Sequence, residues 1–440
     1  MDIAGPTGAG APVVGETATS SETSRTLIFA FFGTVFDGVE LNLLSYPLIY
    51  LSRSLDVGTV AIVGAVTAQG LASLVGGFLF GWLGDVVGRR RAFALCIFTY
   101  GLGTTLAAFS PNYDYFLGTR ILAGLGIGGE FGLAFSMFSE AWRTERRGLM
   151  GGSIQSMFIV GEIVTQGVLY LMLSSLGHDL GWRYGFAILG VFSILVAVAA
   201  FVWVPESRKW LRYQQELKRG EVPPELRRNK IPYIDMFRGG LARGTIAFVI
   251  IMTAIFMYSY SLGTFSATFL LTKAKTPLAA TTEILFIGLV VTIASYMIFA
   301  TLSDYIARKW AFLLSNVVGV IGMAAYLILL TSGKTFVGPQ FWTSPMFWAL
   351  TVAQGGFGGF AIVGVWMSEF FPTRIRSTGS NAAYYAGRGL GAGVYPLGAL
   401  KLAGGDVGYA LSLGIVGAVV GLVVAAFTPD RTGREIHAIE

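Results

Sequence analysis

Charged residues, cysteine and histidine are all scarce in this chain. Charged side chains make up 13% of its 440 residues, whereas soluble domains carry about 25%. The single cysteine, Cys96, excludes an intrachain disulfide and is expected to be a small core residue. His178 and His437 fall outside the apolar segments, so neither predicts a metal site. With no Ser/His/Asp or Cys/His constellation, the sequence does not favour an enzyme.

Sequences that bind nucleotides are absent or out of place. No Walker A sequence occurs, so transport driven by ATP is unsupported. Gly124-Leu-Gly126-Ile-Gly-Gly129 fits the dinucleotide pattern G-x-G-x-x-G, but it lies inside the apolar run 116–138 rather than between a strand and a helix. Small residues at such spacing favour close contact between two helices. The sequence therefore predicts no cofactor.

Long apolar segments dominate the sequence. Hydrophobic residues make up 54% of the chain, and the mean hydropathy is +0.66. Because about 20 apolar residues span a bilayer as a helix, we predict an all-α membrane protein with twelve transmembrane helices, over residues 26–51, 59–83, 91–110, 115–140, 148–175, 183–204, 243–272, 281–302, 309–330, 343–368, 377–402 and 405–427.

Positive charge lies mainly on one side of this predicted membrane. With the N-terminus inside, most of the 31 lysines and arginines fall in cytoplasmic segments, which predicts a multi-pass protein of the cell (plasma) inner membrane with both termini cytoplasmic. Basic residues beside anionic lipid headgroups account for the net charge of +6, so no nucleic-acid partner is expected.

A polar segment containing prolines divides the chain into two similar halves. Asp85 precedes Arg89 after the second span at the spacing by which Asp304 precedes Arg308 after the eighth. This repetition predicts an internal duplication, with a disordered cytoplasmic tail at 1–25, an N-terminal six-helix bundle at 26–204, a cytoplasmic linker at 205–242, a C-terminal six-helix bundle at 243–427 and a cytoplasmic tail at 428–440.

The repeated charges predict a latch that holds the cytoplasmic ends of the halves together. Acidic and basic residues near water can pair and then separate when the halves rock apart. Ordinary decoration of cytoplasmic loops with positive charge is the alternative, but it does not explain the repeated acidic partners. The predicted latch residues are Asp85, Arg89, Glu140, Arg147, Asp304, Arg308, Glu369 and Arg376.

Three segments carry a resemblance to a known family. The loop Gly81–Arg91 resembles the signature of the major facilitator superfamily. Pro205-Glu-Ser-Arg-Lys-Trp-Leu211 and Pro429-Asp-Arg-Thr-Gly-Arg-Glu435 resemble elements of its sugar porters and organic-ion transporters. The chain is identified as a member over about residues 26–435. The resemblance implies two pseudo-symmetric six-helix bundles around a central site that opens alternately to each side.

Several carboxylates lie within predicted spans of the first half. Asp37 and Glu40 share a helix face, and two carboxylates so close in a low dielectric cannot both ionise easily, which favours a proton carrier. The alternative is a structural pair with an arginine, and Arg120 is the candidate partner. Glu130 and Glu162 are further candidates for proton coupling. Glu130 can alternatively bridge to the latch arginines, the role that we favour for it.

Arg388 is the predicted substrate ligand, near the middle of the eleventh span. A guanidinium binds a carboxylate through two parallel hydrogen bonds, and tyrosines supply hydroxyl groups and flat walls. The alternative is a salt bridge from Arg388 to a carboxylate of the first half, which would close a central gate. The other predicted substrate-binding residues are Asn381, Tyr384, Tyr385 and Tyr395 on the same helix face, and Gln155, Tyr258 and Trp366 on other spans.

Two shorter matches indicate a branch of the superfamily. Asp37-Gly-Val-Glu40 resembles the Asp-Gly-x-Asp pattern of aromatic-acid:proton and sialate/monocarboxylate:proton symporters, with Glu in place of the second Asp. Gly128-Gly-Glu130, Glu140-Ala-Trp142 and Arg147-Gly148 resemble the sialate/monocarboxylate branch, although Arg143 stands where that branch has proline.

We therefore expect a secondary active transporter that imports a small organic anion, a monocarboxylate, together with protons by alternating access. The proton is the coupling ion, the lipid bilayer is the surrounding medium, and a monomer is expected. A proton-coupled antiporter or exporter, a sugar-type facilitator and a nutrient receptor that does not transport are the alternatives. The receptor is the least favoured, because the tail after Phe427 is too short for a signalling domain.

Overall fold

A computed structural model describes residues 18–44, 47–142, 145–223, 227, 232–430 and 432, and within these ranges it contains helices and no strand. The helices of the first half and the linker are α1 Ser20–Asn42, α2 Leu48–Ser54, α3 Thr59–Val86, α4 Arg89–Ala107, α5 Tyr113–Ala141, α6 Arg147–Trp203, α7 Arg208–Arg219 and α8 Pro232–Asp235. Those of the second half are α9 Leu241–Thr272, α10 Leu278–Ile306, α11 Arg308–Thr331, η2 Phe341–Thr343, α12 Pro345–Gly355, α13 Gly358–Phe370, η3 Thr373–Ile375, α14 Arg376–Arg388, η4 Gly389–Val394, α15 Tyr395–Leu402, α16 Val407–Ser412 and α17 Gly414–Phe427.

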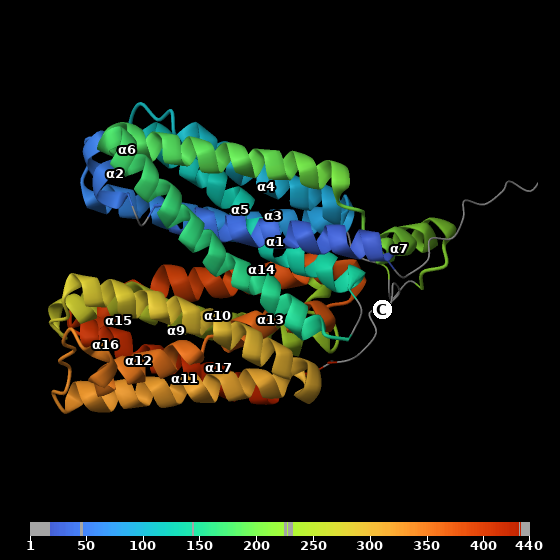
Figure 1. The fold of residues 1–440 in the computed structure, drawn as a ribbon. Helices are drawn as coiled ribbons and strands as arrows, with labels where there is room; N and C mark the ends of the chain where they lie inside the picture. The colour runs from blue at the N-terminus through green and yellow to red at the C-terminus, as the bar shows by residue number, and fades with distance from the viewer. Residues whose placement is uncertain are drawn as a thin grey trace, which may run out of the picture.

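The helices form two bundles that lie side by side (Figure 1). Helices α1 to α6 build one bundle, and α9 to α17 build the other. Within the described residues, eight helices are long and apolar enough by themselves to cross a membrane. The other predicted spans appear as helices that are more polar, such as α1 and α4, or broken, such as α14 with η4 and α15, and α6 counts once although it covers two predicted spans. The twelve-helix architecture predicted from the sequence is confirmed.

The fifth and sixth predicted spans both lie in α6, and only Gly177 separates them. Gly177 within it adopts φ 75°, a conformation that glycine reaches without strain. The chain therefore reverses at this glycine, and α6 contains two antiparallel arms (Figure 1). The sequence predicted a longer loop over 176–182, where helical geometry in fact resumes directly after the glycine.

The first helix begins earlier than its apolar residues predict. Thr19 and Glu22 form a capping box, in which each side chain accepts a hydrogen bond from the other residue's backbone N–H. This cap starts α1 at Ser20, so Ser20–Arg25 is helical although it lies in the segment predicted to be a disordered tail. Residues 1–17 of that tail lie outside the described residues, as do residues 431 and 433–440 of the C-terminal one.

The glycine-rich run of α5 serves helix packing, as predicted. A Cβ atom at Gly124 would lie 2.3 Å from the carbonyl oxygen of Gln69 on α3, and one at Gly126 would lie 2.4 Å from the backbone nitrogen of Tyr100 on α4. Two neighbouring helices therefore approach α5 as closely as backbones allow. Cys96 is fully buried in the same region, as expected for a core residue.

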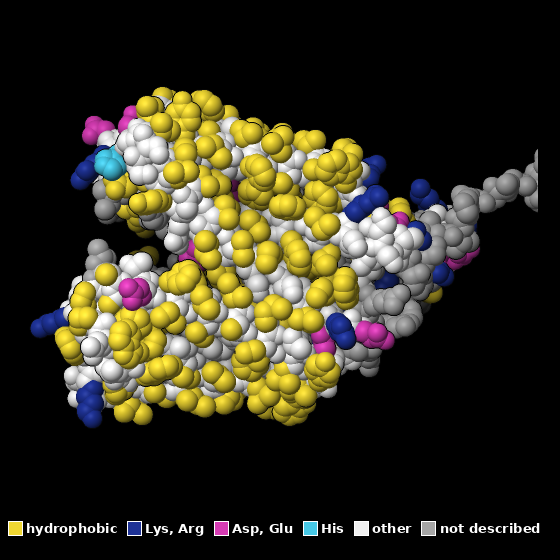
Figure 2. Space-filling model, in the orientation of Figure 1, with side chains coloured by type: hydrophobic (Ala, Val, Ile, Leu, Met, Phe, Trp, Pro, Cys, Tyr) yellow, Lys and Arg dark blue, Asp and Glu magenta, His cyan; other side chains and the backbone are white. Residues whose placement is uncertain are grey.

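The outer surface matches a bilayer environment. Hydrophobic side chains cover the visible flanks of both bundles, whereas lysines and arginines gather towards the two ends (Figure 2). The space-filling view also shows a notch between the bundles at the end away from α7. At the α7 end the bundles are in contact, and this is where the latch residues lie.

Candidate substrate site, coupling site and latch

One half of the latch centres on Glu140, at the end of α5. Its carboxylate accepts hydrogen bonds from Arg89 Nη2 of its own bundle at 3.2 Å and from Arg376 Nη1 of the opposite bundle at 2.7 Å. Asp85 pairs with Arg89 at 2.5 Å and accepts the backbone N–H of Thr378 at 2.8 Å. Thr378 lies in the first turn of α14, where a carboxylate is stabilised by free N–H groups. Glu140 and Asp85 therefore both join the bundles.

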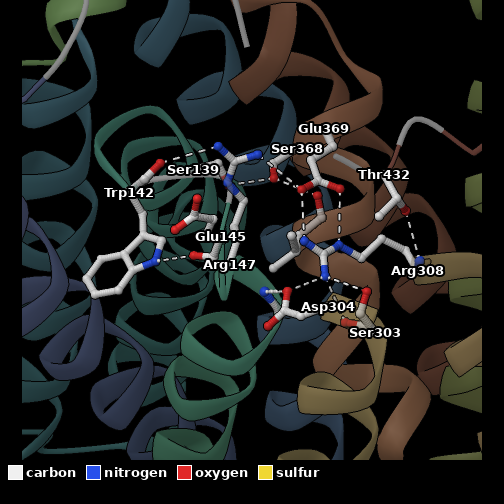
Figure 3. A network of polar contacts seen from close by, with 12 residues as sticks. Ser139, Trp142, Glu145, Arg147, Ser303, Asp304, Arg308, Ser368, Glu369 and Thr432 are labelled. Atoms are coloured by element: carbon white, nitrogen blue, oxygen red, sulfur yellow. Dashed lines mark hydrogen bonds and ion pairs between the residues drawn. The ribbon is translucent and has the colours of Figure 1, made fainter. Parts of the chain in front are cut away.

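The second half of the latch repeats this arrangement (Figure 3). Glu369 accepts hydrogen bonds from Arg147 Nη1 of the first bundle and Arg308 Nη2 of its own bundle, both at 3.1 Å. Asp304 pairs with Arg308 at 2.7 Å and accepts the backbone N–H of Gly148 at 2.7 Å, in the first turn of α6.

The two halves of the latch are thus related by the internal duplication. In each, a glutamate joins one arginine from each bundle, and an aspartate caps a helix of the opposite bundle. All eight predicted latch residues are brought together at one end of the molecule. Their charged groups are almost fully excluded from solvent, so the α7 end is closed while the opposite end shows the notch (Figure 2).

The two sequence elements that resemble sugar-porter motifs support this latch. Glu206 accepts the backbone N–H of Arg89 at 2.8 Å, and Thr432 Oγ1 accepts that of Arg308 at 2.8 Å. Arg89 and Arg308 therefore each begin a helix whose start is capped by the segment that follows their own bundle. Burial raises the pKa of Glu206, and its hydrogen bonds to the backbone of Ser207, Arg90 and Arg89 oppose that shift.

Arg388 is the last residue of α14 and lies at the interface between the two bundles. Its side chain is buried, with 6% of the residue exposed, and Nη1 has no hydrogen-bond partner among the described residues. The guanidinium carbon lies 5.7 Å from the ring centre of Tyr385, and Tyr260 and Tyr384 are near enough to interact electrostatically. A buried guanidinium with an unused donor is costly unless a ligand completes it. Arg388 can therefore bind an anion.

Asp37 of α1 faces this guanidinium from the opposite bundle. Only 2% of the residue is exposed, its Oδ1 has no hydrogen-bond partner in the described part of the chain, and it interacts electrostatically with Arg388. Among the described residues no ion pair within 4.0 Å joins them. The closed salt bridge weighed as an alternative is therefore not formed in this conformation, but the two charges share one electrostatic environment.

Glu40 turns away from this site into its own bundle. Its Oε1 accepts a 2.5 Å hydrogen bond from Thr104 Oγ1, and its Oε2 lies 3.6 Å from Arg120 Nη1. Arg120 is enclosed by aromatic rings, with Phe116 at 5.7 Å and Phe186 at 5.3 Å from the guanidinium carbon. Arg120 is thus the partner of Glu40 rather than of Asp37.

Glu130 lies deep in α5, next to α1. It is buried, and its Oε1 has no hydrogen-bond partner within the described ranges and lies 2.7 Å from the position that a Cβ atom at Gly33 would occupy. It also interacts electrostatically with Asp37. The bridge to the latch arginines that we favoured from the sequence is wrong for this conformation, because the ion pairs of Arg89 and Arg147 go to other carboxylates. Glu130 and Asp37 instead form a pair of neighbouring buried carboxylates.

Glu162 and Gln155 lie on the first arm of α6. Glu162 is half-buried and interacts electrostatically with Tyr296 of α10, so it faces the opposite bundle. Gln155 is buried and its Oε1 has no hydrogen-bond partner. Among the described residues, Gln155 thus keeps a buried acceptor free for another ligand.

Three predicted substrate ligands join the bundles instead of lining an open site. Asn381 Oδ1 accepts the backbone N–H of Gly132 at 2.8 Å, and its Nδ2 donates to Gly129 O at 3.3 Å. Tyr385 donates its hydroxyl to Ile127 O. Tyr384 stacks on Phe131 with ring centres 3.8 Å apart. These contacts fix α14 against α5 in this conformation, so they form a barrier between Arg388 and the latch.

The remaining predicted ligands point elsewhere. Tyr258 donates its hydroxyl to Ala353 O, and Trp366 packs on Phe248 and donates to Pro429 O, all within the second bundle. Tyr395 shares a 2.5 Å hydrogen bond with Ser261. Their polar groups are thus occupied within the bundle that contains Arg388.

Sequence reasoning missed two features of the site. Thr104 was not singled out, because a threonine in an apolar helix carries no distinctive signal. The π-helix η4, which follows Arg388 directly, was also missed, although Gly389-Leu-Gly391-Ala-Gly393 before Pro396 is the composition that allows such a deviation.

The chain resembles transporters in each comparison. The model of the Major Facilitator Superfamily matches residues 28–331. A probable 4-methylmuconolactone transporter of Cupriavidus pinatubonensis is 26% identical over 86% of this chain and 83% of its own length. The cis,cis-muconate transport protein of Acinetobacter baylyi is 26% identical over 92% and 94%. The sialic acid transporter NanX of Escherichia coli is 23% identical over 82% and 84%.

The fold is also that of a solved transporter. The structure of the proton:xylose symporter XylE bound to 6-bromo-6-deoxy-D-glucose superposes with a TM-score of 0.73 over 96% of this chain and 99% of that chain, at 18% identity. A twelve-helix architecture in two bundles, a duplicated charged latch and a family match over most of the chain agree with one another. The chain is a transporter, not an enzyme, and belongs to the major facilitator superfamily.

Proposed function

We propose that this transporter imports a small organic anion, a monocarboxylate, together with protons. The observation that carries the proposal is Arg388, a buried guanidinium with an unused donor at the bundle interface, which faces an unpaired carboxylate of the other bundle. Transport of muconate or sialic acid by the relatives named above supports an acidic substrate.

Coupling follows from the sharing of one positive charge. In the empty site Asp37 is ionised and Arg388 balances its charge. An incoming carboxylate binds Arg388 and brings a second negative charge into a low dielectric, where two neighbouring anions repel strongly. A proton taken up by Asp37 removes that repulsion. The occupied site then has no net charge, which lowers the free-energy cost of enclosing it between the bundles.

Glu130 extends this site towards the interior of the first bundle. It is buried beside Asp37, and two carboxylates so placed share protons more readily than they ionise together. Glu162 faces the second bundle and supplies a further titratable group. We assign proton transfer first to Asp37 and Glu130, because neither has an ion-pair partner among the described residues, and then to Glu40, whose carboxyl interacts electrostatically with Asp37.

The closed latch indicates the side of the membrane to which the site opens in this conformation. If positive-rich loops face the cytoplasm, the latch end is cytoplasmic and the notch of Figure 2 opens outward. This conformation would receive substrate from outside. The proton gradient across a bacterial plasma membrane then favours import, because protons enter with the anion.

A sugar facilitator is the second candidate, and likeness to a xylose symporter concerns the fold alone. A neutral sugar would leave Arg388 without a counter-charge when Asp37 is protonated. An anionic substrate avoids this cost, so the observed charges favour it.

Reconstituted protein tests the proposal. Liposomes with an imposed pH gradient, acidic outside, are expected to accumulate a radiolabelled monocarboxylate from a panel of aliphatic, aromatic and sialic acids. Asp37→Asn is expected to retain exchange of anions and to lose accumulation driven by the gradient. Accumulation of sugars or organic cations without any acid would reject the proposal.

A further inference from the structure

We infer that Thr104 is a positioning residue for proton binding at Glu40: its hydroxyl donates to the carboxylate and holds it more strongly when it is ionised than when it is protonated. This inference deepens the proposed proton coupling and rests on it. Thr104 lies in α4, is fully buried and contacts both members of the Glu40–Arg120 pair.

The pair itself is incomplete without this hydroxyl. Arg120 Nη1 and Glu40 Oε2 are 3.6 Å apart, too far for a hydrogen bond, and neither atom has a hydrogen-bond partner among the residues that the structure describes. Thr104 Oγ1 bridges the two side chains, because it donates to Glu40 Oε1 at 2.5 Å and accepts from Arg120 Nη2 at 3.0 Å. The charges are therefore held together through a neutral group that can rotate.

None of the other groups around Glu40 named here can both donate to its carboxylate and accept from Arg120. Asp37 lies on the same helix and adds repulsion, Tyr100 of α4 interacts with it electrostatically, and Arg120 of α5 can only donate. Gln69 of α3 donates to the backbone carbonyl of Glu40 instead of its side chain. From α6, the ring of Phe186 lies over the Arg120 guanidinium.

A hydroxyl is suited to both states of the carboxylate. When Glu40 is ionised, the hydroxyl hydrogen points to Glu40 and a lone pair accepts from Arg120. When Glu40 binds a proton at Oε2, Thr104 still donates to Oε1, but this bond is weaker because the carboxyl group is then neutral. No proton leaves Thr104, so it positions groups without carrying the proton.

The test compares Thr104→Val with Thr104→Ser, which keeps the hydroxyl. Thr105→Val is the matched control, because Thr105 donates only to Gly101 O of its own helix, at 2.8 Å. Uptake of a transported carboxylate is measured against external pH, and protonation of Glu40 is followed by the infrared band of its carboxyl group, assigned with Glu40→Gln.

Loss of a donor to the ionised form favours proton binding. Thr104→Val is expected to move the pH midpoint of uptake and the pH midpoint of the Glu40 infrared band upwards by about one unit. This is the size expected for one hydrogen bond to a charged group. Thr104→Ser and Thr105→Val are expected to keep the wild-type midpoints. Thr104→Cys, whose thiol is a weak donor of similar size, is expected to give an intermediate shift and serves if the valine variant does not fold.

Wild-type midpoints in Thr104→Val, or in Thr104→Cys where valine is not tolerated, would overturn the inference. A wild-type protein without uptake driven by pH would refute the proposed function instead. In that case the infrared midpoint still tests the role of Thr104, so the two failures can be told apart.

Discussion

Glu369→Gln is expected to open the latch. In the wild-type protein the Glu369 carboxylate receives Arg147 from the first bundle and Arg308 from the second, and all three side chains are nearly inaccessible to solvent. Glutamine keeps the shape and one acceptor oxygen but removes the charge. Arg308 retains Asp304 at 2.7 Å, whereas among the described residues Arg147 keeps only a hydrogen bond to the Trp142 carbonyl at 3.3 Å. The substitution therefore weakens mainly the contact between Arg147 and residue 369, which joins the bundles.

The magnitude follows from the cost of a buried unpaired charge. Removing one partner of a buried pair costs about 3–5 kcal/mol, and the lower value applies here because an opened latch lets water reach Arg147. About 3 kcal/mol changes an equilibrium constant roughly 150-fold. A protein that is about 99% latch-closed would then be closed in fewer than half of the molecules.

Spin labels at the opposite end can measure this change. Ser175, near the turn of α6, and Lys334, after α11, are exposed on different bundles, and the only native cysteine, Cys96, is fully buried. With cysteines at 175 and 334, Glu369→Gln is expected to shorten the main interspin distance, because the notch closes as the latch opens. Glu140→Gln is expected to act in the same direction, and Glu283→Gln, at an exposed position in the first turns of α10, is expected to leave the distribution unchanged. An unchanged distribution in both latch variants would refute the reasoning.

Three further predictions concern other parts of the molecule. Arg388→Lys is expected to weaken carboxylate binding at least tenfold, as measured by titration calorimetry, because a lysine cannot form the two parallel bonds of a guanidinium; wild-type affinity would remove Arg388 from the site. Ala307→Gly is expected to raise the melting temperature by a few degrees, since Ala307 adopts φ 77°, ψ 149°, a region that costs a residue with a Cβ about 1–3 kcal/mol; no gain in a thermal-shift assay would show that the loop is unstrained. Asp406→Asn is expected to lower the melting temperature slightly at pH 7, and this effect is expected to disappear at a pH low enough to protonate the wild-type carboxyl. The hydrogen bond from Lys273 holds the pKa of Asp406 below its usual value, so its contribution is present at neutral pH and lost as the pH falls; an equal effect at both pH values would contradict this assignment.

The sequence predicted those parts of the site whose signals are local or repeated. Charges inside apolar segments identified Asp37, Glu40 and Arg120, and the duplicated Asp-to-Arg and Glu-to-Arg spacings identified the eight latch residues. Spacing within one helix could not show what faces that helix. Asn381 and Tyr385 share the helix of Arg388, yet they bind the backbone of α5, and Tyr258 and Trp366 face the interior of their own bundle.

The amino-acid sequence by itself determined the membrane setting, the number of helices and the duplication, because hydropathy, charge bias and repeated motifs depend on residues close together along the chain. Tertiary structure alone decided which charges meet. Asp37 and Glu40 are one turn apart on α1, but one faces Arg388 across the interface and the other faces Arg120 through Thr104. That division depends on how neighbouring helices are rotated and packed, which is set by contacts between residues far apart in the chain.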